Sequence, residues 1–212
     1  MRKIIRFFHQ HAFEDEEKSI SAYETCGIAC ILMIRDLYQR VQYPTRKQEL
    51  DFYNSYRSKA YMGTLGSAIA YCLSTDELKV CLMHSSEEIL DNKGMYFAPE
   101  LFDSILKEWK WYMEKCKKPT EIFTGVSITC DTIKEQIACG RQVILLCLID
   151  GNVDGVHEKT LHWIVVYGYK DNKFLACDPS KCKRSFSEDE LWEYMDTPLG
   201  QVCITVEEGR GL

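Results

Sequence analysis

The sequence predicts an α+β fold: a mainly helical part over about residues 1–140, then a mostly antiparallel sheet over about residues 141–212. In the first part, apolar residues recur at helical spacing, as in the segment CGIACILMI that begins at Cys26. The second part holds continuous apolar runs, QVILLCLI and HWIVVYGY, which are typical of buried strands. A length of 212 residues suits one domain, so we expect residues 1–212 to form a single unit.

The expected helices are marked by residues that favour helix ends. Thr45 precedes the second helix, Pro99 opens the long segment PELFDSILKEWKWYMEKC, and Ser187 with Glu190 forms a capping box. Asp131 is expected to cap the segment TIKEQIAC, which ends at Gly140. The predicted helices span residues 26–39, 45–53, 67–73, 99–116, 132–139 and 188–195.

The expected strands lie mostly in the last third of the chain. Lys170–Asn172 is a turn between two apolar runs and predicts a hairpin. One earlier strand is expected near Leu78–Met83, and QVCITV closes the sheet. The predicted strands span residues 78–83, 142–149, 162–169, 173–180 and 201–206.

Composition excludes several classes of function. The net charge is −6 and no long basic run occurs, which argues against nucleic-acid binding. No apolar stretch is long enough to span a bilayer, so no membrane part is expected. An odd number of cysteines, 11, in a chain without a recognisable export signal indicates a reducing, cytoplasmic setting with mostly free thiols.

Three residues have the chemistry and the placement for thiol catalysis. Cys26 begins the first helix, where backbone N–H groups can stabilise a thiolate or an oxyanion. His162 begins a later strand and can act as the base, and Asp178, across the hairpin, can accept its ring N–H. A Cys near the N-terminus followed by a His about 130–150 residues later is the papain-type arrangement.

These boxes resemble a known family. CGIACILMI, HWIVVYGY and CDPS are similar to the Cys, His and Asp boxes of the C39-like peptidases, papain-fold enzymes that trim leader peptides after paired glycines. The resemblance implies a papain-like cysteine protease fold with Cys26 as nucleophile, His162 as base and Asp178 as its orienting carboxylate. It implies no metal and no organic cofactor.

The sequence departs from this family at the oxyanion donor. Members usually carry a Gln six residues before the Cys, where this chain has Ile20. The candidate oxyanion-hole or cleft residues are Gln10, Ser21, Tyr23, Gly27 and Trp163. We expect Gly27 to let a substrate carbonyl approach without meeting a Cβ atom. We expect Trp163 to pack against the cleft floor or to shield the His–Asp hydrogen bond.

The expected reaction is acyl transfer through a thioester on Cys26. The substrate is a peptide or a carrier-protein-bound acyl group, and the acceptor is an amine or water. The sequence lacks both the family Gln and a transporter part. In these two respects it resembles stand-alone, amide-forming homologues of the closthioamide-assembly type. A C39-type leader peptidase that hydrolyses peptides is the first alternative, and an inactive papain-fold binding module is the second.

A metal site is a further alternative for the same cysteines and histidines. Structural zinc sites usually have two tight ligand pairs, and the C-x3-C and C-x4-C spacings of this chain are looser than that pattern. The residues that such a site would use are Cys26, Cys30, Cys177, Cys182, His157 and His162.

Overall fold

Seven strands form one sheet in a computed structural model that describes residues 24–40, 45–153 and 156–209. The strands are β1 (Lys79–His84), β2 (Thr120–Phe123), β3 (Gln142–Val153), β4 (Val156–Lys170), β5 (Lys173–Asp178), β6 (Cys182–Phe186) and β7 (Val202–Glu207). Their order across the sheet is β2-β1-β7-β3-β4-β5-β6. Only the β1–β2 pair is parallel among these strands, which confirms the expected mostly antiparallel sheet.

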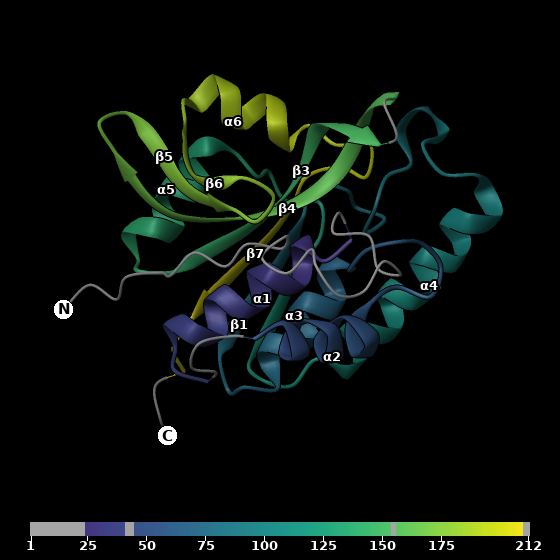
Figure 1. Cartoon of the computed structure of the whole chain (residues 1–212), viewed down its shortest axis with the longest axis horizontal. Coiled ribbons are helices and arrows are strands. Elements are labelled where there is room, and N and C mark those ends of the chain that lie inside the picture. Colours follow the sequence, from purple (N-terminus) through teal and green to yellow (C-terminus); the bar gives the residue numbers. More distant parts are fainter. Residues whose placement is uncertain (1–23, 41–44, 154–155, 210–212) are drawn as a thin grey trace.

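Helices cover both faces of the sheet (Figure 1). They are α1 (Cys26–Leu37), α2 (Arg46–Tyr56), α3 (Gly66–Ser74), α4 (Pro99–Lys115), α5 (Cys130–Ala138) and α6 (Glu188–Met195), with a short 3-10 turn at Lys93–Met95. Helices α1 to α4 share one apolar core with one face of the strands, whereas α5 and α6 pack on the other face. Among the helices of the described residues, none has the length and hydropathy of a membrane-spanning segment.

The alternation of side chains along β3 and β4 explains why the sheet has an apolar core on each of its two faces. In β3, Ile144 and Leu146 belong to the core under α1, while Val143 and Leu145 belong to the core under α5 and α6. Successive side chains of a strand point to opposite faces, so a continuous apolar run is required where both faces are covered. The run QVILLCLI is therefore a central strand with helices on both sides.

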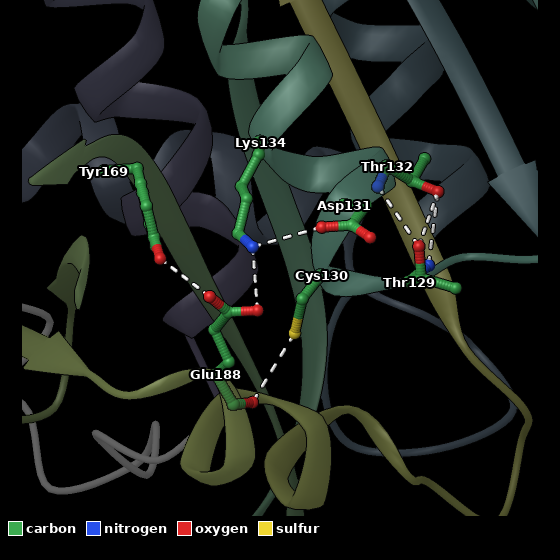
Figure 2. Close-up of polar contacts among 7 residues, drawn as sticks. All are labelled: Thr129, Cys130, Asp131, Thr132, Lys134, Tyr169 and Glu188. Atoms are coloured by element: carbon green, nitrogen blue, oxygen red, sulfur yellow. Dashed lines mark hydrogen bonds and ion pairs between the residues drawn. The ribbon is translucent and has the colours of Figure 1, made fainter. Parts of the chain in front are cut away.

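Two helix ends differ from expectation. Helix α1 ends at Leu37 rather than Gln39, because Gln39 adopts a left-handed conformation with φ of 59°. Thr129, rather than Asp131, caps α5: its side chain accepts from the Thr132 N–H, and the Thr132 hydroxyl accepts from the Thr129 N–H. Figure 2 shows these two threonines paired, while Asp131 lies inside the helix and contacts Lys134. The expected caps Thr45 and Ser187 are confirmed, each with a complete capping box.

Lys134 also connects α5 to α6 and the sheet (Figure 2). Its Nζ lies 2.7 Å from Glu188 Oε2, and the other Glu188 oxygen accepts from the Tyr169 hydroxyl at 2.7 Å. The Cys130 thiol donates to the Glu188 carbonyl at 3.4 Å. These contacts fix the two helices on the face of the sheet opposite α1.

The structure contains two strands that the sequence analysis missed. β2 is a four-residue edge strand paired only with β1, and β6 is a five-residue edge strand paired only with β5. Strand β4 also begins at Val156, six residues before the expected start, so His162 lies inside the strand and not at its first residue. Short, partly polar edge strands carry little apolar periodicity, which explains why both were missed.

Candidate active site

Cys26 is the first residue of α1, and its side chain is almost fully buried. The preceding Thr25 makes no side-chain cap, so no hydroxyl competes for the backbone N–H groups of the first turn. Those N–H groups have no acceptor within the helix, and the helix dipole gives them partial positive charge. α1 lies against β4, which brings the sulfur to the strand that carries His162 (Figure 1).

His162 and Asp178 form a buried hydrogen-bonded pair. Nε2–H of His162 donates to Asp178 Oδ1 at 2.8 Å, and the two side chains are 4% and 1% exposed. Val165 of β4 pairs with Cys177 of β5, which sets Asp178 diagonally across from His162. The side chain of Cys26 is close enough to the same imidazole to interact with it. Because Nε2 faces the carboxylate, Nδ1 is the nitrogen left for the sulfur.

Asp178 is held by three further groups from nearby residues. Its Oδ1 accepts from the backbone N–H of Ser180 at 3.0 Å and from the Ser180 hydroxyl at 2.7 Å. Its Oδ2 lies 3.3 Å from Nη1 of Arg184 on β6. Both carboxylate oxygens therefore have partners, and the oxygen that faces His162 is held in place by Ser180.

The electrostatics of the pair favour an ionised state. Burial lowers the pKa of His162, but the hydrogen bonds to Asp178 and Cys26 outweigh it and raise the pKa to about 9. Burial raises the pKa of Asp178, but the hydrogen bond and charge of His162, with the Ser180 bonds, hold it well below its usual range. At neutral pH the pair is an imidazolium beside a carboxylate.

Three other buried thiols surround this site. Cys30 lies one turn along α1, Cys147 of β3 is paired with His162 across the sheet, and Cys177 directly precedes Asp178. Burial raises the pKa of each of these three thiols, most strongly those of Cys30 and Cys147. At neutral pH they stay protonated and behave as small apolar residues.

Gly27 has a packing role that differs from the expected one. A Cβ atom at this position would lie 2.8 Å from Thr64 Cβ and 3.2 Å from both Ile69 Cδ1 and Trp163 Cδ1. Protein atoms, and not a substrate carbonyl, therefore take the space that the missing side chain leaves. Gly27 allows α1, the segment before α3 and strand β4 to approach closely.

Trp163 joins β4 to the segment that precedes α3. Its indole Nε1–H donates to the Thr64 carbonyl at 2.9 Å, and the side chain is 3% exposed. The far edge of the ring packs on Gly66, where a Cβ would lie 2.9 Å from Trp163 Cη2. Because its N–H is already bonded, Trp163 positions the strand next to His162 and is a poor oxyanion donor.

The remaining candidates from the sequence fall outside the described part of the chain. Gln10, Ser21 and Tyr23 are in residues 1–23, as is Ile20, so their places relative to Cys26 stay predictions. For the metal alternative, no group of three or more His, Cys, Asp or Glu within the described residues is arranged to hold an ion. Of the six residues named for that site, the side chains of His157 and Cys182 are not described.

The sequence analysis overlooked two residues that hold Asp178: Ser180 and Arg184. Ser180 had a signal, since Asp-Pro-Ser is a turn sequence in which the Asp side chain commonly accepts from the backbone two residues on. Arg184 lies on a strand that was not predicted, and it carries no local pattern that links it to the site.

A search of curated proteins finds no match. Among solved structures, a chain described provisionally as a C39-like peptidase from Bacillus anthracis is 10% identical, with 98% of this chain and 97% of that chain covered and a TM-score of 0.45. A family model matches residues 21–201, which is most of the chain, and the protein therefore belongs to the Peptidase_C39 like family.

Proposed function

We propose that the protein transfers an acyl group through a thioester on Cys26. One observation carries the proposal: the Cys26 side chain at the start of α1 is close enough to interact with an imidazole whose Nε2–H donates to Asp178 at 2.8 Å. A nucleophile within hydrogen-bond reach of a base that is itself oriented by a third group is the arrangement that nucleophilic catalysis requires.

Each member of the trio has one role in this reaction. The Cys26 thiolate adds to the acyl carbonyl carbon, and the carbonyl π electrons move to oxygen. As the intermediate collapses, the leaving group takes a proton from the His162 imidazolium and the acyl-enzyme remains. The acceptor then gives its proton to His162 as it attacks the thioester, and the Cys26 thiolate leaves. Asp178 keeps the ring in the tautomer that presents Nδ1 to sulfur.

The proposed substrate is a peptide or a carrier-protein-bound acyl group, with an amine as acceptor. The sequence supports an activated donor, because Ile20 stands where the family places a side-chain oxyanion donor. Losing one such donor typically costs about 10²–10³ in turnover. A thioester tolerates that loss better than a peptide does, because its thiol leaving group needs little protonation. Hydrolysis of a peptide is the second candidate, which the peptidase family favours.

Thiol alkylation tests whether Cys26 works as a nucleophile. We expect iodoacetamide to modify Cys26 rapidly near neutral pH, with site occupancy read by peptide mass mapping, and we expect His162→Ala to abolish that rapid phase. Cys139 serves as the internal control, because it is exposed and should react equally in both proteins. Slow modification of Cys26 with no dependence on His162 would instead favour an inactive binding module.

Product analysis separates the two acceptors. The wild-type protein is given an acyl-thioester donor with and without candidate amines, and the products are identified and quantified by mass spectrometry. Amide in excess of free acid supports the transferase, whereas free acid alone at every amine concentration would contradict amine transfer and favour hydrolysis. The Cys26→Ala variant gives the background rate for the donor.

A further inference from the structure

Arg184 extends the polar contacts of the site to the edge strand β6. It lies opposite Ala176 of β5, and Asp178 is two residues further along β5 on the same face of the sheet. A long side chain can reach such a diagonal neighbour on the next strand. Nη1 of Arg184 accordingly lies 3.3 Å from Asp178 Oδ2. The register of the two strands therefore brings a guanidinium to the carboxylate that holds His162.

Two aromatic rings hold the guanidinium of Arg184. Its central carbon lies 4.7 Å from the ring centroid of Phe186, on the same strand, and 5.7 Å from that of Tyr194, on α6. A cation near an aromatic face is attracted by the ring quadrupole, so both contacts stabilise the charged group in this place. The Arg184 side chain is 28% exposed and that of Asp178 only 1%. A partly exposed cation therefore ends beside a buried carboxylate.

The two oxygens of Asp178 have different partners. Oδ1 accepts from His162 and from both donors of Ser180, whereas Oδ2 faces Arg184. Because Oδ1 already has three donors, Arg184 is not needed to orient that oxygen. Within the described part of the chain, no other Lys or Arg forms an ion pair with Asp178. The distinct contribution of Arg184 is a permanent positive charge.

The buried carboxylate requires this charge at one stage of acyl transfer. While His162 is an imidazolium, it balances the negative charge of Asp178. When Nδ1 of the ring gives its proton to the leaving group, the ring becomes neutral and Asp178 stays ionised. An unpaired carboxylate in a buried position is costly, so with Asp178 alone the ring would retain its proton more strongly.

We propose that Arg184 is a positioning residue that balances the charge of Asp178 while His162 gives its proton to the leaving group. The inference rests on the proposed acyl transfer. No bond to Arg184 forms or breaks: the proton moves from Nδ1 to the leaving group, Nε2–H stays bonded to Oδ1, and the guanidinium stays at Oδ2. Arg184 thereby makes the imidazolium a better acid than Asp178 alone would allow.

The other ionisable groups around the pair do not replace this charge. Burial raises the pKa of Cys30, Cys147 and Cys177, so these thiols are mostly neutral near pH 9. Lys183, next to Arg184, points to the opposite face of β6. The ionisable groups that α1, β3, β5 and β6 place around His162 are Cys26, Cys30, Cys147, Cys177, Asp178 and Arg184.

The titration of His162 tests this role without any substrate. In the wild type the pKa of His162 is raised to about 9 despite burial. For Arg184→Gln we expect the midpoint, followed by NMR of the imidazole ring, to rise by about one pH unit, because a nearby cation disfavours the imidazolium. Arg184→Lys keeps the charge and should titrate near the wild-type value. Repeating the comparison with Cys26→Ala removes the coupled titration of that thiol.

Arg141→Gln is the matched control. It removes a guanidinium that is 25% exposed and is paired with Glu207, a carboxylate that makes no contact with His162. The His162 midpoint should therefore stay at the wild-type value in this variant. If Arg184→Gln does not fold, Arg184→Met makes the same test with an apolar side chain that can still pack on Phe186.

Three results would overturn the proposal. An unchanged midpoint in Arg184→Gln means that the guanidinium does not act on His162. A lower midpoint means that Arg184 only keeps Asp178 in place for its hydrogen bond to the ring. An equal rise in Arg184→Lys means that the shape of the guanidinium matters and its charge does not. Failure of the wild type to form acyl-Cys26 would instead refute the acyl-transfer function, which this titration does not measure.

Discussion

Asp178→Asn removes the negative charge that faces His162 while keeping a side chain of nearly the same shape. In the wild type the pKa of His162 is raised from 6.5 to about 9, although burial alone would lower it. At about 1.4 kcal/mol per pKa unit, this shift favours the imidazolium by about 3 kcal/mol. Without the carboxylate, burial dominates, and we expect the His162 pKa to fall to 6.5 or below.

The titration of His162 can be followed directly by NMR of the imidazole ring. The chain has five histidines, and the His162 signal is the one that disappears in His162→Gln. We expect a midpoint near pH 9 in the wild type and at or below pH 6.5 in Asp178→Asn. Asp171→Asn is the control, because that carboxylate is 84% exposed and has no contact with the ring. A midpoint that stays near pH 9 in Asp178→Asn would refute the reasoning.

The same shift predicts how folding stability depends on pH. Because the folded-state pKa of His162 is raised, its contribution is fully present below pH 6.5 and is lost as the pH rises through about 9. In urea unfolding, the stability difference between wild type and His162→Gln should therefore shrink by about 3 kcal/mol from pH 6.5 to pH 10. Buried thiols also titrate in this range, and subtracting the variant removes their common effect. A difference that stays constant or grows would contradict the assignment.

Three further substitutions test the surroundings of the site. Gly27→Ala should lower the free energy of unfolding by about 1–3 kcal/mol, because the new Cβ would lie 2.8 Å from a neighbouring side chain. Gly168→Ala is the control and should lower it clearly less, because its Cβ would meet only ordinary van der Waals contacts. Equal losses of stability in the two variants would argue against the clash. Ser180→Ala should lower the free energy of unfolding by about 1–2 kcal/mol at pH 7, measured in urea, because a hydrogen bond to a carboxylate is lost. If the same loss of stability remains at low pH, where Asp178 is protonated, this cause is wrong. Burial lowers the pKa of His84 to about 4, so its contribution to folding stability is present above pH 6.5 and is lost as the pH falls to 4. His84→Asn should therefore lose less stability than the wild type between pH 6.5 and pH 4. An equally steep fall in the free energy of unfolding would contradict this prediction.

The predicted papain-like α+β class is confirmed by the mixed sheet, its helices and the family. Local sequence patterns were sufficient to predict elements whose formation depends on a single segment of the chain. The helix that begins at Cys26 and the capping box at Ser187 are examples, because apolar spacing and cap chemistry are short-range signals. The hairpin after His162 likewise predicted that Asp178 would lie beside the ring, since strand pairing follows from the turn.

Features that depend on distant packing were beyond the sequence. The space beside Gly27, which we expected to accept a substrate carbonyl, is filled by Thr64, by Ile69 of α3 and by Trp163 of β4. Arg184 reaches Asp178 from an edge strand whose residues alternate weakly. None of these relations has a spacing that could be read along the chain.

The central claim is that Cys26 carries the acyl group. The most direct measurement gives the wild type and His162→Ala an acyl-thioester donor for a short time, quenches with acid, and maps the acylated peptides by mass. The account predicts one acyl group on the peptide that contains Cys26 in the wild type and almost none on it in His162→Ala. Equal acylation of that peptide in both proteins, or acylation confined to the exposed Cys139, would contradict the account.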